Sequence, residues 1–195
     1  MQLKLVITLC IACLASGMLI GETLKKPGLS LEPKKENYKH SIGSSFFLFG
    51  NLAHGDSPYY FQLNYGYQLS RNGYLNIEAL TWTYYEPLGT YGNSVQKYPG
   101  SIRAFGIGIG YQHFIWNNLY AAIQVTPFIQ NFIGEDDRKI QNGFQLYMSF
   151  ITGYRFEFFK KRFYIEPAIA LKYWPVESNF PDAFDAVRQG TGRHI

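Results

Sequence analysis

The chain has 195 residues, of which 16 are Tyr, 16 Phe and 3 Trp, and its formal net charge is +4. Charged residues make up only 16% of it, against about 25% in an ordinary soluble domain, while the mean hydropathy is −0.15. The aromatic content excludes a disordered chain, and two cysteines exclude a disulfide scaffold. No basic patch for nucleic acid is visible, and no apolar run beyond the first two dozen positions is long enough for a transmembrane helix.

Residues 1–17 are expected to be a secretory signal peptide. Lys4 supplies the positive start, Leu5–Ala15 is an apolar stretch too short to span a membrane, and Ala15-Ser16-Gly17 offers small residues for cleavage. Cleavage after Gly21 is a second choice. Residues 18–40 then form a polar, Lys-containing arm, and residues 41–195 form the folded domain. The expected location is the outer membrane, reached by export.

From about position 41 the sequence alternates with a period of two, which is typical of strands. The clearest run is Ser101–His113, in which Phe105, Ile107 and Ile109 alternate with glycines. Seven strands are expected, over Ile42–Asn51, Tyr59–Leu69, Leu75–Thr83, Ser101–His113, Leu119–Gln130, Phe144–Phe158 and Phe163–Tyr173.

The two faces of these strands indicate a membrane barrel. One face is long and apolar, with aromatic residues near its ends, and the other is rich in Gly, Ala, Gln, Asn and Ser, as the interior of a small barrel would be. The segments also match the length of tilted membrane strands. Short links alternate with long ones, as in barrels with short periplasmic turns and long outer loops. The short links are Ser70–Gly73, Ile115–Asn118 and Phe159–Arg162.

These patterns, with segments such as Phe105–Tyr111 and Phe163–Pro167, resemble the small eight-stranded outer-membrane barrels of Gram-negative bacteria, of OmpA/OmpX-like architecture. The closer resemblance is to uncharacterised outer-membrane β-barrel proteins of Bacteroidetes type. The resemblance implies an all-β fold, an up-and-down antiparallel meander forming a transmembrane β-barrel. Its implied partners are outer-membrane lipid and the barrel assembly machinery. Family members end on a strand with an aromatic last residue, whereas no eighth strand is visible before Ile195. We expect a truncated product or a partner that closes the seam.

Five charged residues fall on the inward face: Glu78, Arg155, Glu157, Glu166 and Lys172. Because buried charges must be paired, we expect a polar network that fills the lumen rather than a conducting pore.

Other candidate sites lie in the links between strands. His54, Asp56 and Ser57 stand close enough in sequence to suggest nucleophilic catalysis, although Gly-Asp-Ser is also ordinary turn chemistry. The link after the third predicted strand is rich in tyrosine, at Tyr84, Tyr85, Tyr91 and Tyr98, and is expected either to present a binding surface or to anchor the membrane rim. No metal-ligand spacing is found, and neither a metal nor another cofactor is expected.

The expected function is therefore a structural or loop-mediated binding role without catalysis, toward an extracellular ligand that the sequence does not identify. Two alternatives stay open. One is an outer-leaflet enzyme that hydrolyses or transfers acyl groups of lipid A, and the other is a soluble, periplasmic, lipocalin-like lipid carrier.

Overall fold

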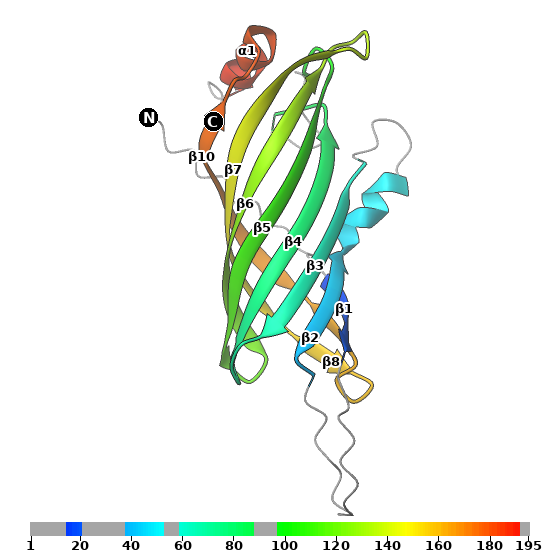
Figure 1. Ribbon diagram of the computed structural model, residues 1–195, viewed down its shortest axis with the longest axis vertical. Helices are drawn as coiled ribbons and strands as arrows, with labels where there is room; N and C mark the ends of the chain where they lie inside the picture. Colours follow the sequence, from blue (N-terminus) through cyan, green and yellow to red (C-terminus); the bar gives the residue numbers. More distant parts are fainter. Residues whose placement is uncertain (1–14, 21–37, 53–58, 88–96, 192–195) are drawn as a thin grey trace, which may run out of the picture.

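A computed structural model describes residues 15–20, 38–52, 59–87 and 97–191 of the chain. Figure 1 shows a tall, twisted sheet with a short helix across one end. The strands are β1 (Ala15–Ile20), β2 (His40–Ser45), β3 (Phe61–Gln68), β4 (Gly73–Tyr84), β5 (Ser101–Trp116), β6 (Leu119–Ile133), β7 (Lys139–Tyr154), β8 (Phe156–Phe158), β9 (Phe163–Glu166) and β10 (Ala168–Ser178). The helices are the 3-10 helix η1 (Phe46–Leu52) and α1 (Asp182–Thr191).

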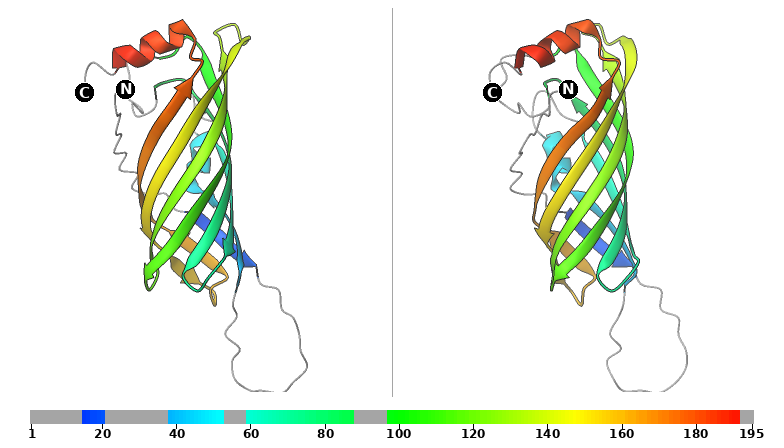
Figure 2. Two further views of the ribbon diagram at one scale, coloured as in Figure 1. Left: turned by 60° about the vertical axis from the view of Figure 1, so that its left-hand side comes forward. Right: turned by 90° about the vertical axis from the view of Figure 1, so that its left-hand side faces the viewer.

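The fold is an antiparallel up-and-down meander. The hydrogen-bonded order is β10-β7-β6-β5-β4-β3-β2-β1-β9-β8. The short links β3–β4, β5–β6 and β8–β9 lie together at one end of the sheet, and α1 lies at the other (Figures 1 and 2). The hairpin at Asn72-Gly73 closes with hydrogen bonds from the amides of Leu69 and Ser70 to the carbonyl of Gly73. The expected class of fold, mostly β and antiparallel, is thus confirmed.

Alternation places large apolar side chains on the outside of the sheet. In β5, Phe105, Ile107 and Ile109 are 48%, 57% and 57% exposed. Residues of β5 that point to the inner face, such as Ala104 and Gln112, are buried. The inner face is therefore small and polar and the outer face is apolar, which is the reverse of a soluble sheet protein.

Two strands that the sequence predicts as continuous are each interrupted once. Arg155 separates β7 from β8, and Pro167 separates β9 from β10. The two breaks face one another, because the amide of Tyr154 donates to the carbonyl of Pro167. Proline has no amide hydrogen and cannot donate to the ladder, so regular pairing stops there. The amide of Arg155 instead donates to the carbonyl of Asn118 in a neighbouring turn.

The first predicted strand, Ile42–Asn51, is wrong in its second half. The strand ends at Ser45, and Phe46–Leu52 form η1. The hydroxyl of Ser45 accepts from the amide of Phe47, and the side-chain amide of Asn51 bonds to both backbone groups of Tyr60. These side chains satisfy backbone groups that a ladder would otherwise pair, and the run Phe46–Phe49 has no alternation to hold it in a sheet.

Part of the predicted signal peptide lies within the sheet. β1 pairs with β2 from Ala15↔Ser45 to Ile20↔His40 and with β9 from Ala15↔Glu166 to Met18↔Phe163. The place between β2 and β9 is therefore taken by a strand from the N-terminal side, rather than by a strand that follows β10. Residues 1–14 lie outside the described part, and cleavage after Gly17 stays a prediction.

Hydrogen bonding does not close the sheet into a barrel. β10 pairs with β7 along one edge, from Ala168↔Gly153 to Ser178↔Phe144. Within the described ranges no strand pairs with the other edge of β10. β1 pairs with β2 on one side and with β9 on the other, and within those ranges its pairing does not continue from β9 onto β10.

The sequence analysis did not predict α1. Phe184 on this helix is fully buried and packs against Phe132 of β6 and against Tyr98, with ring centroids 5.3 and 5.1 Å away. Arg188 on the same helix pairs with Asp185 and with Glu177 of β10. The helix thereby covers the apolar cluster at this end of the sheet, which consists of Leu80, Tyr84, Tyr98, Ile102, Ala104, Phe128, Phe132 and Phe184.

Candidate functional site

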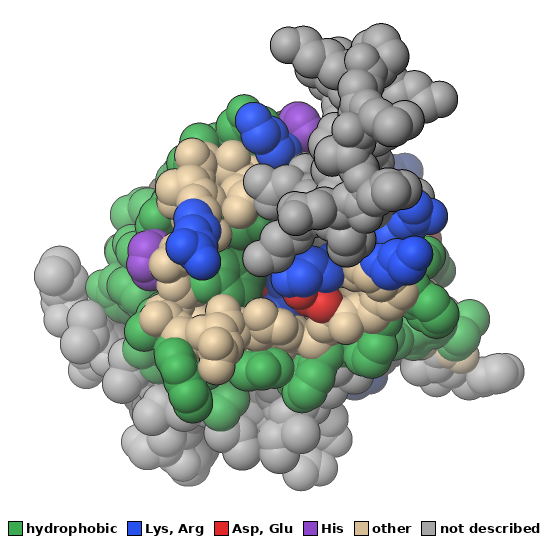
Figure 3. Space-filling view, turned by 90° about the horizontal axis from the view of Figure 1, so that it is seen from below, with side chains coloured by type: hydrophobic (Ala, Val, Ile, Leu, Met, Phe, Trp, Pro, Cys, Tyr) green, Lys and Arg blue, Asp and Glu red, His purple; other side chains and the backbone are tan. Residues whose placement is uncertain are grey.

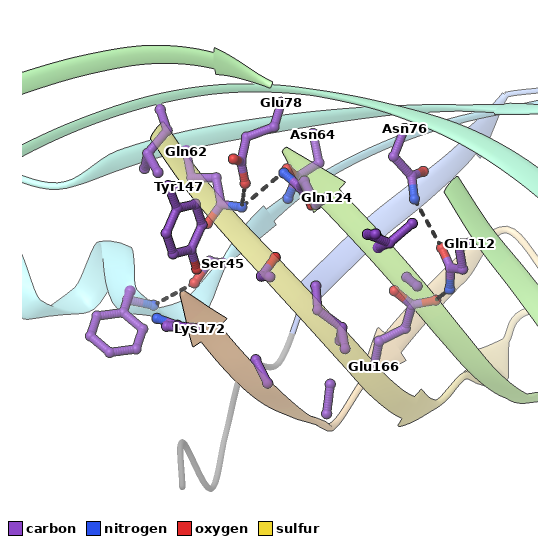
Figure 4. A pocket seen from close by; sticks show the side chains of 18 of the residues that line it. Ser45, Gln62, Asn64, Asn76, Glu78, Gln112, Gln124, Tyr147, Glu166 and Lys172 are labelled. Carbon is purple, nitrogen blue, oxygen red and sulfur yellow. Dashed lines mark hydrogen bonds between the residues drawn. The ribbon is translucent and has the colours of Figure 1, made fainter. Parts of the chain in front are cut away.

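The inner face of the sheet encloses a cavity of about 420 Å³. Its volume is within the range of small-molecule sites, about 300–1,000 Å³. Figure 4 shows Lys172 and Tyr147 toward one end of the pocket and Gln112 and Glu166 toward the other. The aromatic belt, as we call the rings that line the pocket on the side of α1, consists of Phe47, Tyr60, Trp82, Tyr84, Phe128, Tyr147 and Trp174.

Glu78 lies on the inner face of β4 and is only 5% exposed. Its carboxylate accepts hydrogen bonds from Gln62 Nε2 at 2.6 Å and from Thr126 Oγ1 at 2.9 Å. Gln62 in turn donates to Asn64 and accepts from the hydroxyl of Tyr60. A buried carboxylate is tolerated where donors satisfy it, and the amide-rich inner face supplies them here.

Glycines on β5 make room for this arrangement. A Cβ atom at Gly108 would lie 2.2 Å from Thr126 Oγ1, the atom that donates to Glu78. At Gly106 a Cβ would lie 2.8 Å from the ring of Phe128, which belongs to the aromatic belt. The space beside the glycines of β5 is thus filled by side chains of the adjacent strand β6.

Arg155 and Glu166 form a buried ion pair, with 2.5 Å between Arg155 Nε and Glu166 Oε1. Arg155 is itself the break between β7 and β8, and Glu166 directly precedes the break at Pro167, so the pair lies where both strands are interrupted. Glu166 also accepts from Gln112 at 3.0 Å. Three rings surround the guanidinium, and their centroids lie 4.5–5.0 Å from its carbon: Tyr74, Phe114 and Tyr164.

The ion pair leaves one donor without a partner. Arg155 Nη1 is buried and makes no hydrogen bond within the described part of the protein. Rings attract a guanidinium through their faces but do not accept its edge hydrogens as a carbonyl would. This end of the cavity therefore has donor capacity that the described side chains do not use.

Lys172 lies on the inner face of β10 and lines the cavity. Its ammonium lies 6.0 Å from the centre of the Tyr147 ring, at the limit of a cation–π contact. Among the described residues, no hydrogen bond or ion pair uses this ammonium, in contrast to the carboxylates of Glu78 and Glu166.

The structure brings together some of the charged residues that the sequence assigns to one polar network. Arg155 and Glu166 are in contact, Glu78 belongs to a separate cluster with Gln62 and Thr126, and Lys172 lies beside the aromatic belt. Glu157 is not part of either cluster. It pairs at 2.6 Å with Lys161, in the turn between β8 and β9.

The remaining predicted sites divide into two groups. His54, Asp56 and Ser57 lie outside the described residues. Of the tyrosines expected at a binding surface or rim, Tyr84 and Tyr98 are buried beneath α1. Burial raises the pKa of the Tyr98 hydroxyl, and the nearby carboxylate of Glu177 raises it further. Tyr98 packs against Phe184 of α1, while Tyr84 packs against Tyr98 and accepts a hydrogen bond from Gln130.

The end of the sheet with the short turns carries exposed basic side chains. They gather on this face in Figure 3 and include Lys39, Arg71, Lys160, Lys161 and Arg162.

Within the described ranges, no three His, Cys, Asp or Glu residues are grouped as metal ligands would be. No helix in the described ranges is long and apolar enough to cross a membrane.

No family model, no curated protein and no solved structure matches this chain.

The sequence analysis missed the partners that make the site. Gln112, Thr126 and Gln62 looked like ordinary polar members of the inner face, and nothing in their spacing singles them out. The signal that was present is alternation, which places all three on the same inward face as Glu78 and Glu166. Gln62 lies on β3 beside the strand of Glu78, whereas Thr126 on β6 and Gln112 on β5 reach carboxylates on strands that are not their hydrogen-bonded neighbours.

Proposed function

We propose that this protein is an outer-membrane β-barrel with a structural or loop-mediated binding role. The observation that carries the proposal is the apolar outer face of the sheet. Large apolar side chains stand exposed on β3, β4, β5, β6, β7, β9 and β10, for example Leu63, Ile77, Ile107, Ile129, Phe150, Phe163 and Ile169. Soluble monomers rarely expose contiguous apolar patches beyond a few hundred Å².

A lipid bilayer around the sheet would cover the apolar outer face and would leave the polar inner face away from lipid. The outward residues gain an apolar surrounding, while the backbone groups of the wall pair between strands. Exposed aromatic residues at the strand ends, such as Trp116 and Phe159 at the short turns and Tyr59 near the other end, suit the two membrane interfaces. The amide-rich interior needs no lipid contact.

Closure into a full barrel belongs to the same proposal. β7 and β8 follow one another with a single residue between them, as do β9 and β10, so each pair can serve as one bent wall strand. β1 then lies between the last of these strands and β2. The edge of β10 that has no partner in the described ranges must be covered in lipid, because unpaired backbone groups there are costly.

The test is cell fractionation of the full chain with its N-terminus intact, followed by extraction with alkaline carbonate. We expect the protein in the outer-membrane fraction, resistant to carbonate and released by detergent. A folded barrel should also migrate differently on gels before and after boiling. Recovery of folded protein in the soluble periplasmic fraction without detergent would overturn the proposal.

That last result would favour a soluble lipid carrier. The observation behind this alternative is the cavity of about 420 Å³ on the inner face of the sheet. The exposed apolar outer face argues against the carrier. The lipid-modifying enzyme rests on His54, Asp56 and Ser57, which lie outside the described residues, and it stays a prediction.

A further inference from the structure

We infer that the cavity binds a single-chain amphiphile with a carboxylate head, held by Lys172, and with its apolar chain against the aromatic belt. This goes beyond the proposed function, because a structural barrel needs no ligand inside it. The charged groups in the cavity wall differ in whether protein groups already bind them.

Four charged side chains line the cavity: Glu78, Arg155, Glu166 and Lys172. Both carboxylates are satisfied by the protein, since Glu78 accepts from Gln62 and Thr126, and Glu166 accepts from Gln112 and Arg155. The unused hydrogen-bonding capacity of the charged groups lies on the cations, at the Lys172 ammonium and at Arg155 Nη1. A ligand that completes this wall is therefore an acceptor with negative charge rather than a cation.

Lys172 is the better placed of the two cations for such a head group. Arg155 is 3% exposed, is paired with Glu166 and is enclosed by three rings. Lys172 is only partly buried, and in Figure 4 it stands at the end of the pocket opposite Glu166. The Lys172 ammonium makes no hydrogen bond or ion pair among the described residues, but its charge also acts on the nearby Glu78 carboxylate. A head group with a single charge, such as a carboxylate, is repelled less by Glu78 than a doubly charged phosphate would be.

The surroundings of Lys172 specify the rest of the ligand. Its neighbour two residues along β10 is Trp174, its ammonium faces Tyr147, and Tyr147 packs against Trp174 with centroids 5.7 Å apart. Trp82 and Tyr60 continue the belt on β4 and beside β3. These rings offer apolar faces to an alkyl chain. A cavity of about 420 Å³ suits a chain of medium length.

The same residues lie where the sheet is incomplete. Lys172 and Trp174 belong to β10, and Phe47, which also lines the cavity, belongs to η1. No strand of the described ranges pairs with the edge of β10 along this height. The cavity thus lies next to the edge of β10, which backbone hydrogen bonds do not close within the described ranges. An amphiphile can approach the cavity from this side.

The experiment is fluorescence quenching of the full chain in phosphatidylcholine nanodiscs, with empty nanodiscs as blank. Trp116 is replaced by Phe, because it is exposed at a turn, whereas the other two tryptophans, Trp82 and Trp174, line the cavity. The probe is a terminally brominated undecanoate, compared with the alcohol and the trimethylammonium compound of the same chain. If the protein does not enter nanodiscs, the membrane proposal fails, and the same titration is run in buffer.

We expect saturable quenching by the acid, weaker quenching by the alcohol and the weakest by the cation. Lys172→Gln should weaken acid binding at least about tenfold and leave the alcohol unchanged. Lys160→Gln, which removes an exposed lysine from a turn, is the matched control and should change nothing. Ala122→Phe, which fills the cavity from β6, should abolish quenching by acid and alcohol alike.

The inference is overturned if the three probes quench equally, if none saturates, or if Lys172→Gln binds the acid as well as Lys160→Gln does. If Lys172→Gln does not fold, the order of the three probes on the parent protein and the effect of Ala122→Phe decide the question.

Discussion

Arg155 Nε lies 2.5 Å from Glu166 Oε1, in the interior of the sheet at the two places where its long strands break. Neither residue is exposed enough for water to stabilise its charge. The pair therefore joins the two interrupted strands beside their breaks.

Removing one member of this pair should destabilise the protein strongly. Arg155→Met leaves the Glu166 carboxylate buried beside Gln112 alone, and breaking a buried pair costs about 3–5 kcal/mol. We expect a markedly lower unfolding temperature for Arg155→Met and a smaller loss for Glu166→Gln, which keeps an acceptor for the guanidinium. Glu157→Gln is the control, because its partner Lys161 is exposed, and it should cost at most about 1 kcal/mol. Equal stability of all three variants would contradict the structural role of the pair.

The glycine at position 108 should not tolerate a side chain. In Gly108→Ala the new Cβ would meet Thr126 Oγ1 at 2.2 Å and displace the hydroxyl that donates to Glu78. We expect a loss of about 1–3 kcal/mol in the free energy of unfolding. Adding Thr126→Ala to Gly108→Ala relieves the clash, so the double variant should lose less than the sum of the two single variants. Additive losses would show that the two positions do not interact.

Charge on the outer face distinguishes a membrane protein from a soluble one. Ile109 is 57% exposed in the middle of β5, so Ile109→Arg would be harmless in water. In a bilayer the same change costs about 2–4 kcal/mol near the midplane. We expect less assembled protein in the membrane fraction for Ile109→Arg, and little change for Phe159→Arg in a turn. Normal assembly of both variants would count against lipid contact at β5.

Attachment of α1 should weaken at high pH. The pKa of Tyr98 is raised in the folded protein, chiefly by burial, above the ordinary value of 10.0. The packing of Tyr98 against Phe184 is therefore fully stabilising below about pH 10 and is lost as pH rises through the raised pKa. Titration of tyrosine absorbance, together with protease susceptibility at Arg188, follows this change.

Tyr98→Phe is the matched variant for that titration, because it keeps the ring and removes the ionisable hydroxyl. It should leave α1 protected to higher pH than the parent protein. If both proteins expose the helix at the same pH, another group controls its attachment.

The sequence predicted most of the strands because alternation is a local property. A run such as Phe105 to Tyr111 shows its two faces without reference to any other part of the chain, and Asn72-Gly73 specifies its own hairpin. The prediction failed where contacts with distant parts of the chain decided the structure of a segment. Phe46–Leu52 became η1 through the side chains of Ser45 and Asn51, and a segment assigned partly to a signal peptide became β1.

The candidate site shows the same division. The alternation of side chains along each strand was enough to place Glu78, Arg155, Glu166 and Lys172 on the inner face. Only register and the strand breaks decided that Arg155 meets Glu166, that Thr126 and Gln62 satisfy Glu78, and that Glu157 pairs with a turn lysine instead.

The sequence by itself thus determined which face of each strand is apolar, because that follows from the alternation of side chains along an extended chain. The tertiary structure alone decided the partners of the charged residues, the cavity and the packing of Phe184 beneath α1. These depend on contacts between residues far apart in the chain, such as Phe132 with Phe184 and Gln112 with Glu166, and the distances between such residues are set only when the strands come into register.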